Sequence, residues 1–592
     1  TLIFREGVQV IESQAFSGCN SLTQIEFPST LTAIHTYAFS ECTTLPSLSL
    51  PSSVKEISYD AFYRCKKLES LTVDSKNTVY HSDGNCIIET ESKTLILGCK
   101  NSEIPSDGSV TCIGVYAFSD RIGLTSIVVP NSITSIKESA FSGCANLESI
   151  TLPFVGTTAD GEGNKKFSSI FAYYGYSYND VPASLKTVII TGGTSVADFA
   201  FSGCQNIVNI ALPDSVTSIG KGVFQACAAL ENISVAAGNT IYHSVNNCLI
   251  QTETKTLIAG CKKSEIPNDG SVVSIAEAAF SGCSGLAIII IPNGVTNIGS
   301  EAFLNCVKLK DITLPNSVIS IDNSAFRDCT GLTSIIIPNT VVTIGECAFR
   351  GCTGLTNLAV PDSVTNIGKS AFLGCSNIES ITLPFIGASK DGTENTDFGY
   401  IFANGYGYYD IPATLKTVII TGGTSIGSSA FKKCSGIENI TIPGSITSIG
   451  SAAFEECTGL AGVYITDIGK WCAIDFADAY ANPLANAHKL YLNDTLLTSV
   501  VIPKSIRKIG AFAFSGCHEI TSWTIQNGVE SIGKSAFSDC KGLTKFTVPG
   551  SVTSIGESAF SGCTNLESIT LPFVGTMEDG TGNKKFGSIF GS

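Results

Sequence analysis

The chain has 592 residues, of which 15% are charged, and its formal net charge is −15 with a pI of about 4.9. A surface of this sign repels phosphate backbones and anionic headgroups, and no cluster of Lys and Arg reverses it locally, so we expect no nucleic-acid partner. No run of 18 apolar residues occurs, so we expect no membrane insertion by this segment.

The sequence begins and stops inside its own repeating pattern. The spacing between Phe4 and Phe16 equals the spacing between Phe27 and Phe39, so the first residues already belong to a repeat strand. The residues after Leu571 start an insert that is completed twice upstream. We therefore expect a fragment cut at both ends, with any targeting or anchoring signal outside it.

A unit of 23 residues recurs along the chain and is clearest at 550–572, GSVTSIGESAFSGCTNLESITLP. Self-similarity at a fixed period of this size is typical of stacked repeats. Its Phe560 has counterparts 23 residues apart in three regular runs, at Phe16, Phe39 and Phe62; at Phe280, Phe303, Phe326, Phe349 and Phe372; and at Phe514, Phe537 and Phe560.

Each unit contains two kinds of extended segment. Ile569 and Leu571 alternate with small polar residues, which predicts a strand with one buried face. Pro572 cannot donate to a ladder and marks the end of that strand. Val552 and Ile555 predict a second, shorter strand, and the Ala-Phe segment after it predicts a 3₁₀ or single helical turn that closes the coil.

Seventeen coils carry the Ala-Phe signature, once as Val223-Phe224, and sixteen of them place a Cys three residues after the Phe. The exception is Arg121, after Phe118. A lone coil buries too little apolar surface to fold, so its stability must come from stacking on neighbours. We expect a β-rich α/β solenoid in which about 21 or more coils form one long parallel sheet and one continuous array over 1–592.

Longer steps between the phenylalanines predict five inserts. Those at 74–105 and 236–267 share an Asn-Cys strand and a Lys-Thr-Leu-Ile strand, and each predicts a hairpin that enlarges one coil. Those at 154–184 and 385–414 combine an aspartate-glycine loop with an aromatic cluster outside the repeat core. The insert at 466–494 predicts a short helix-rich excursion and a strand.

The repeat x-Leu-x-x-Ile-x-Leu-Pro-x-Ser-Val-x-x-Ile-Gly-x-x-Ala-Phe-x-x-Cys resembles the BspA-like leucine-rich repeat family, and the resemblance covers essentially the whole chain. It implies a curved right-handed solenoid at a cell surface or in secreted form, with roles in adhesion and protein binding. It implies no catalytic residues and no cofactor.

The sixteen repeat cysteines are the most conspicuous chemical feature. Neighbouring coils bring them close enough for disulfides, but we expect small buried thiols that hydrogen-bond the adjacent coil. In the hairpin inserts, Cys86 and Cys99, and likewise Cys248 and Cys261, are symmetric about a turn. Each pair is therefore expected to face across two strands, where a disulfide stays possible.

Neither the histidines nor the acidic loops predict a catalytic or metal site. His81 and His243 are equivalent in the two hairpin inserts, but neither has a recognisable nucleophile and acid nearby in the sequence. The loop Asp160-Gly161-Glu162-Gly163-Asn164 and its copies at 391–395 and 579–583 lack the ligand spacing of a calcium loop. We expect surface turns, no metal, no cofactor and no enzyme.

Aromatic residues around glycines in two inserts are the candidate ligand-binding residues. Tyrosine combines an apolar ring with a polar tip at low entropy cost, so exposed clusters mark binding to proteins or sugars. The alternative is that these rings fold back and cover a coil edge. The candidates are Phe171, Tyr173, Tyr174, Tyr176 and Tyr178 in one insert and Phe402, Tyr406, Tyr408 and Tyr409 in the other.

Two function classes follow from these patterns. The first is a non-enzymatic cell-surface or secreted protein that mediates adhesion by binding a host or neighbouring-cell surface protein or glycan, as a monomer. The second is a structural spacer that presents another module and has no ligand of its own. A binding array of matrix proteins and glycans would separate the two classes.

Overall fold

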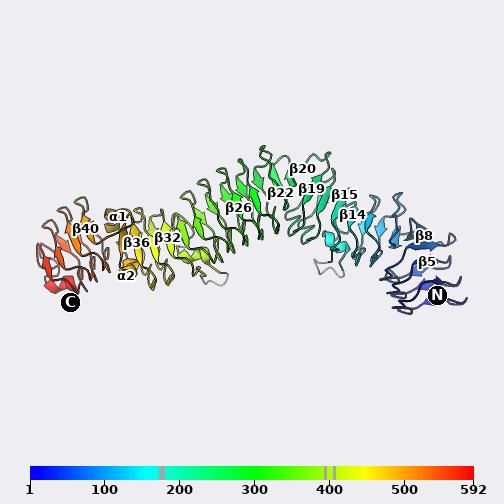
Figure 1. Ribbon diagram of the computed structural model, residues 1–592, viewed down its shortest axis with the longest axis horizontal. Helices are drawn as coiled ribbons and strands as arrows, with labels where there is room; N and C mark the ends of the chain where they lie inside the picture. Colours follow the sequence, from blue (N-terminus) through cyan, green and yellow to red (C-terminus); the bar gives the residue numbers. More distant parts are fainter. Residues whose placement is uncertain (173–179, 393–395, 405–408, 592) are drawn as a thin grey trace. The chain divides into compact units, whose positions relative to one another are not determined.

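The computed structural model describes residues 1–172, 180–392, 396–404 and 409–591. The chain forms two compact units, one of Thr1–Pro292 with Ala302–Val307 and one of Asn293–Glu301 with Lys308–Ser592. Each unit is a stack of coils whose strands pair in parallel with those of the next coil (Figure 1). The predicted parallel-sheet solenoid with short helical turns is confirmed, and the single continuous array over 1–592 stays a prediction.

The main strands have one buried and one outward face, as the alternating pattern predicts. In the first unit β14 (Ser149–Leu152) pairs in parallel with β15 (Thr187–Ile190), and Ile150 lies opposite Val188. Both side chains are fully buried. The same inward positions recur in every coil, so the core is a column of aliphatic residues behind the sheet.

The first unit contains the following strands, named in chain order with the helix between them: β1 (Leu2–Ile3), β2 (Val10–Ile11), β3 (Ile25–Glu26), β4 (Ala33–Ile34), β5 (Ser47–Leu50), β6 (Glu56–Ile57), β7 (Ser70–Val73), β8 (Tyr80–Asp83), β9 (Cys86–Glu89), β10 (Thr94–Leu97), β11 (Cys112–Ile113), β12 (Ser126–Val128), β13 (Ser135–Ile136), β14, η1 (Phe167–Ile170), β15, β16 (Ser195–Val196), β17 (Asn209–Leu212), β18 (Ser218–Ile219), β19 (Asn232–Val235), β20 (Tyr242–Val245), β21 (Cys248–Gln251), β22 (Thr256–Ala259), β23 (Ser274–Ile275) and β24 (Ile288–Ile290).

The second unit continues the same alternation of main and short strands: β25 (Asn297–Ile298), β26 (Asp311–Thr313), β27 (Ser320–Ile321), β28 (Thr343–Ile344), β29 (Asn357–Ala359), β30 (Asn366–Ile367), β31 (Ser380–Leu383), η2 (Phe398–Phe402), β32 (Thr417–Ile420), β33 (Ser425–Ile426), β34 (Asn439–Thr441), β35 (Ser448–Ile449), β36 (Gly462–Ile465), α1 (Ile468–Cys472), β37 (Asp475–Phe476), η3 (Ala479–Ala481), α2 (Leu484–Ala487), β38 (Leu490–Leu492), β39 (Thr495–Leu496), β40 (Ser499–Ile502), β41 (Lys508–Ile509), β42 (Ser522–Ile525), β43 (Ser531–Ile532), β44 (Lys545–Thr547), β45 (Ser554–Ile555), β46 (Ser568–Thr570) and η4 (Phe586–Phe590).

The Ala-Phe segments of the regular coils are single turns, which is one of the two predicted alternatives, and they are not 3₁₀ helices. Ser324 and Asp328, on either side of Phe326, have left-handed φ angles of 55° and 58°. The N–H of Ser324 donates to Glu346 O at 2.8 Å and that of Phe326 to Ala348 O at 2.8 Å. The left-handed residues redirect these N–H groups toward the next coil, so this segment forms a third ladder between coils.

The repeat phenylalanines stack on one another inside each unit. In the first unit the rings of Phe16 and Phe39 are 5.3 Å apart at 9°, and those of Phe280 and Phe303 are 5.1 Å apart at 5°. Fixed spacing between coils therefore produces rows of stacked rings. These rows, with the aliphatic column, make the interior of the solenoid.

The two hairpin inserts form as predicted. In the first, β8, β9 and β10 run antiparallel, and β10 then pairs in parallel with β11, which returns the chain to the coil pattern. Gly98 follows β10 at a point where a Cβ would lie 2.2 Å from the Phe118 ring. Only glycine fits under the phenylalanine row here, because any side chain would displace that ring.

The other inserts also contribute elements to the stack. The insert at 466–494 contains α1, β37, η3, α2 and β38, which confirms the predicted helix-rich excursion followed by a strand. The inserts at 154–184 and 385–414 contain η1 and η2, which the sequence interpretation had as loops. Across the described ranges, no helix has the length and apolar character needed to cross a membrane.

Candidate functional site

The two phenylalanines among the predicted ligand-binding residues are core residues. Phe171 is 1% exposed and Phe402 is fully buried. The Phe171 ring lies 6.2 Å from that of Phe141 and 5.3 Å from that of Phe167. The prediction that Phe171 and Phe402 lie outside the repeat core is therefore wrong, because η1 and η2 fill the gap that the long step leaves in the phenylalanine row.

Tyr409 is the one predicted tyrosine within the described residues. Its side chain is 47% exposed, its hydroxyl donates to Asp397 Oδ2 at 2.5 Å, and its ring passes close over Gly399. Tyr409 thus combines an anchored hydroxyl with a partly open ring. Tyr173, Tyr174, Tyr176, Tyr178, Tyr406 and Tyr408 lie outside the described residues.

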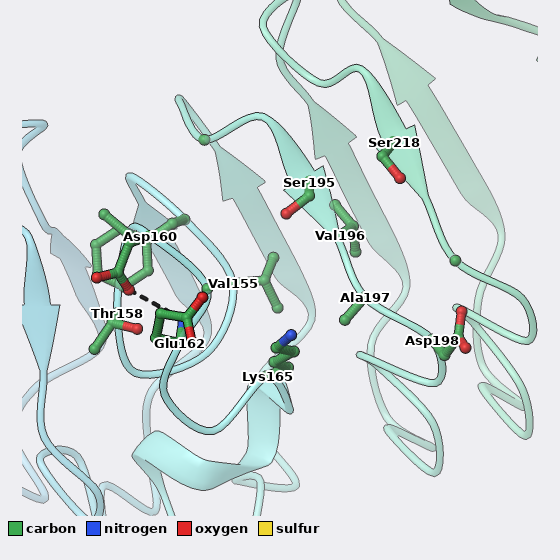
Figure 2. A pocket seen from close by; sticks show the side chains of 15 residues that line it. Val155, Thr158, Asp160, Glu162, Lys165, Ser195, Val196, Ala197, Asp198 and Ser218 are labelled. Atoms are coloured by element: carbon green, nitrogen blue, oxygen red, sulfur yellow. Dashed lines mark hydrogen bonds between the residues drawn. The ribbon is translucent and has the colours of Figure 1, made fainter.

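A pocket of about 270 Å³ lies in the first unit between the loop of the 154–184 insert and the short strands β16 and β18 (Figure 2). The loop is fixed by an antiparallel bridge from Thr158 to Ser135 and by a 3.0 Å bond from Glu162 N to the Asp160 carboxylate. That bond lowers the pKa of Asp160. Val155 and Val196 supply apolar walls.

The charged groups of this pocket are three carboxylates, Asp160, Glu162 and Asp198, and one ammonium, Lys165 (Figure 2). Within the described ranges, no group of three or more His, Cys, Asp or Glu side chains is placed to hold a metal ion. The loop therefore acts as a structured surface turn that forms one wall of a small polar pocket.

The outward face of the main sheet carries both polar ladders and exposed apolar side chains. Asn232 donates to the side chain of Asn209 at 2.7 Å, and Asn209 donates to Thr187 at 3.1 Å. On β24, by contrast, Ile288 is 62% and Ile290 67% exposed. The exposed isoleucines therefore make part of this face hydrophobic.

The repeat cysteines link each coil to the one before it. Cys144 Sγ donates to Phe118 O at 3.0 Å, and Cys352 Sγ donates to Phe326 O at 3.1 Å. Burial raises the pKa of Cys144 to about 12. All 23 cysteines lie within the described residues and none of them forms a disulfide there, and of the repeat set only Cys19 and Cys563 are incompletely buried.

The predicted facing of Cys86 and Cys99 is wrong. Ile88 pairs with Leu95 but Ile87 pairs with Leu97, because a bulge shifts the register between these positions. Cys99 Sγ accordingly lies 3.6 Å from Asn85 O. The second hairpin has the same shift, so Cys248 and Cys261 are not directly opposite either.

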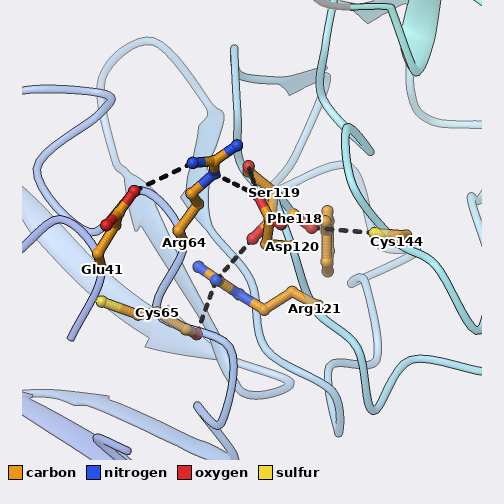
Figure 3. Close-up of polar contacts among 8 residues, drawn as sticks. All are labelled: Glu41, Arg64, Cys65, Phe118, Ser119, Asp120, Arg121 and Cys144. Carbon is orange, nitrogen blue, oxygen red and sulfur yellow. Dashed lines mark hydrogen bonds and ion pairs between the residues drawn. The ribbon is translucent and has the colours of Figure 1, made fainter. Parts of the chain in front are cut away.

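Arg121, the exception in the cysteine column, is fully buried (Figure 3). Its Nε donates to Gly98 O at 2.8 Å, and its Nη1 donates to Cys65 O at 2.9 Å and to Ser119 O at 2.7 Å. Burial lowers the pKa of Arg121. The side chain therefore joins three successive segments of the chain, where a cysteine would reach only one.

Sequence reasoning missed an aromatic group in the first unit. The rings belong to three coils but meet on the surface formed by the Ala-Phe turns, and Tyr59 is 59% exposed. The signal was available in the sequence, since tyrosines recur two or three residues before, or one after, a repeat Phe. We call these residues the tyrosine cluster: Tyr37, Tyr59, Tyr63 and Tyr116.

Comparison with protein-family models gives one match. The BspA type leucine-rich repeat region matches the chain in six segments: residues 1–107, 92–169, 174–258, 255–379, 406–472 and 487–579. No curated protein matches the chain.

Several solved structures are similar to the chain. A leucine-rich repeat protein from Bacteroides ovatus is 22% identical, and the match covers 83% of this chain and 92% of that one with a TM-score of 0.32. The pneumococcal vaccine antigen PcpA is 20% identical over 78% of this chain and 80% of that one, with a TM-score of 0.33. A leucine rich cell surface protein from Faecalibacterium prausnitzii is 22% identical over 75% and 86%, with a TM-score of 0.30.

Proposed function

Because the chain belongs to the BspA-type leucine-rich repeat family, we propose that it is a non-enzymatic cell-surface or secreted protein that mediates adhesion by binding proteins or glycans. Membership of this family indicates a protein-binding repeat protein. Adhesion, the surface location and the ligand class are the parts that we propose.

The observation that carries this proposal is the exposed apolar side chains on the outward face of the sheet. Folding of a coil requires only its inward residues, yet Ile288 and Ile290 of β24 are 62% and 67% exposed. Ile336, at the position equivalent to Ile290 in a coil of the second unit, lies outside any strand and is 84% exposed. Neighbouring exposed apolar side chains lose water favourably when a partner covers them. A passive spacer has no need of such residues.

The tyrosines of the inserts at 154–184 and 385–414 form the second part of the proposal. Phe171 and Phe402 serve the core and are excluded from it. The ligand-binding role is proposed for Tyr173, Tyr174, Tyr176 and Tyr178 and for Tyr406, Tyr408 and Tyr409. Two weak sites on one chain raise the avidity for a polymeric or cell-surface ligand.

The test is binding of the labelled chain to an array of extracellular-matrix proteins and glycans. We expect saturable binding to at least one ligand. Ile288→Ser with Ile290→Ser, or Ser at the insert tyrosines, should weaken it by about tenfold or more. Tyr480→Ser is the matched control, because Tyr480 is 56% exposed but lies in a different insert.

A chain that binds no ligand in the array, and none on intact cells, would favour the passive spacer. Unchanged binding in both folded variants would show that the ligand contacts another surface. Circular dichroism of each variant separates a lost contact from a lost fold.

A further inference from the structure

The tyrosine cluster brings four rings from three coils into one continuous surface of the first unit. Tyr63 lies at its centre, with its ring 6.0 Å from that of Tyr37 and 5.1 Å from that of Tyr116. The Tyr59 ring lies 6.1 Å from the Tyr116 ring at an angle of 27°. Tyr59 is the most exposed member, and its open face is the accessible aromatic surface.

Packing does not require these tyrosines. The segment from Phe199 to Cys283 repeats the plan of the segment from Tyr37 to Arg121, position for position. Both segments build the same coils and the same hairpin insert. The positions of Tyr37, Tyr59, Tyr63 and Tyr116 are occupied in the second segment by Phe199, Lys221, Gln225 and Ala278.

Acidic groups outnumber basic ones around the cluster. The Arg64 guanidinium lies 5.2 Å from the centre of the Tyr63 ring, so this surface already holds one cation over a ring face. Arg64 also contacts Glu41 at 3.0 Å and Asp120 at 3.6 Å (Figure 3). These two carboxylates share one exposed guanidinium, because the second guanidinium that acts on Asp120, that of Arg121, is fully buried.

Asp60 adds a third carboxylate, and it is buried beside the rings. It follows Tyr59 in the chain, is 4% exposed, and its carboxylate accepts from the backbone N–H of Tyr37. Within the described ranges no group donates to its Oδ1. Burial raises the pKa of Asp60. A buried carboxylate oxygen without a donor is costly to maintain, and a cationic donor that reached it would satisfy it.

We propose that the tyrosine cluster, with Asp60 beneath it, binds an Arg or Lys side chain from a basic segment of a partner protein. Tyrosine faces attract cations, and the carboxylates of Asp60, Glu41 and Asp120 complement the charge. The net charge of −15 steers a basic segment toward the chain. This inference rests on the proposed function and specifies one surface and one partner chemistry for it.

A protein segment fits this chemistry better than the other candidates. A neutral sugar would use the rings but not the excess of carboxylates. A quaternary ammonium would use the rings but has no N–H to donate to Asp60. Arginine uses both, because its planar guanidinium stacks on a ring and donates in the same plane.

The experiment measures fluorescence anisotropy of a fluorescein-labelled Arg-Gly-Arg-Gly-Arg-Gly peptide titrated with the full chain. We expect binding at least tenfold tighter than that of the Glu-Gly-Glu-Gly-Glu-Gly peptide. Tyr59→Ser should weaken binding about fivefold, whereas Tyr480→Ser, at an equally exposed tyrosine of another region, should leave it unchanged. Because Tyr59 is largely exposed, its replacement should not disturb the coil.

Asp60→Asn separates local recognition from general attraction. Asp214→Asn is its control, because Asp214 is an exposed aspartate elsewhere in the first unit and both variants change the net charge by the same amount. We expect Asp60→Asn to weaken binding of the arginine peptide about threefold or more and Asp214→Asn to have no measurable effect on it. Equal losses of affinity in the two variants would mean that the peptide responds only to the net charge of the chain. That result would overturn the proposal.

Competition distinguishes the other ligands. Tetramethylammonium and guanidinium are compared as competitors of the arginine peptide at equal ionic strength. If tetramethylammonium displaces the peptide equally effectively, the surface binds a quaternary ammonium and the assignment to a protein segment is overturned. If the Tyr59→Ser variant no longer binds a glycan on the array but still binds the peptide, the surface is a sugar site instead. Array binding that survives Tyr59→Ser while the peptide does not bind would reject this inference and leave the proposed function intact.

Discussion

Two segments of the first unit, 37–121 and 199–283, share their interior except at Arg121 and differ on their surface. In both, an asparagine holds the start of the hairpin: Asn77 donates to Pro51 O and Val54 O, and Asn239 makes the matching pair of bonds. In both, a glycine lies directly under a phenylalanine ring. The tyrosine cluster occurs only in the first segment. Apart from Arg121, the buried residues that fold the coil are thus kept in both segments, and surface residues differ.

The difference at Arg121 shows how far a shared interior can change. Cys283 occupies the same position in the second segment, and its Sγ donates to Gly260 O at 3.7 Å. Arg121 donates to the equivalent Gly98 O at 2.8 Å and also to Cys65 O. The equivalent carbonyl therefore accepts a hydrogen bond from a weak thiol donor in one segment and from a guanidinium in the other.

Arg121→Ala should have the largest effect of the changes that test this comparison. It removes three charge-assisted bonds to carbonyls and leaves a cavity, so we expect a loss of about 3–5 kcal/mol of local stability. Cys283→Ala, the matched change, should cost about 1–2 kcal/mol. Hydrogen exchange of the two hairpins in the intact chain measures both. Equal losses of stability in the two variants would show that the Arg121 guanidinium stabilises its segment no more than the Cys283 thiol does.

Asn77→Ala and Asn239→Ala should have equal effects, because each asparagine makes the same four bonds. Besides the two carbonyls, each side chain accepts from two backbone N–H groups, those of Val79 and Tyr80 in the first segment. Losing all four should cost about 2–3 kcal/mol in each case. Hydrogen exchange of the residues that begin each hairpin provides the measurement. A clear difference between the two variants would mean that the interiors are not equivalent.

Alkaline pH should destabilise both segments through their buried thiols. Burial raises the pKa of Cys86 and of Cys248 to about 12, from an ordinary value of 9.0. Between these pH values the unfolded chain has released the thiol proton and the folded chain still holds it. Stability therefore falls as pH rises, by about 1.4 kcal/mol per pH unit for each such thiol.

Cys86→Ala and Cys248→Ala each remove one of these thiols and should reduce the alkaline loss by the same amount. Urea unfolding followed by circular dichroism at pH 8.5 and pH 10.5 tests this. Lysine and tyrosine ionisation affects the parent chain and both variants equally, so the difference between parent and variant reports the thiol alone. An alkaline loss that does not change in either variant would mean that these thiols ionise normally in the folded chain.

Tyr59→Lys should have the smallest effect on stability, because the second segment carries Lys221 at this position and folds to the same coil. Tyr59 is largely exposed, so we expect a change within about 0.5 kcal/mol. The thermal unfolding midpoint of the variant checks this. A loss of several kcal/mol would show that the tyrosine cluster is part of the fold and not a surface available to a partner.

The sequence predicted the coil correctly where one physical requirement repeats. Ile569 and Leu571, and their equivalents, predict a half-buried strand because side chains alternate at period two. The constant step between repeat phenylalanines predicts stacking because Phe560 must meet Phe537. These requirements are local or act between adjacent units, so they can be read without coordinates.

The errors came where a contact depends on register or on a distant coil. Cys86 and Cys99 are symmetric in the sequence, but a bulge in the strand pair moves them out of register. Phe171 lies among glycines and tyrosines in the sequence, yet the gap left by the long step draws it into the phenylalanine row. Nothing local to either residue signals these outcomes.

By itself the sequence determined the family, the coil and the place of every hairpin insert, because periodicity records which residues must face inward. Only the tertiary structure decided which outward residues meet. Tyr37, Tyr63 and Tyr116 are far apart in the chain, and stacking brings their rings within 5.1 to 6.0 Å of one another in successive pairs. Their places beside the repeat Phe show that they share one corner of the coil, but outward side chains are free of the packing that fixes the repeat, so which rings meet follows from how the coils stack.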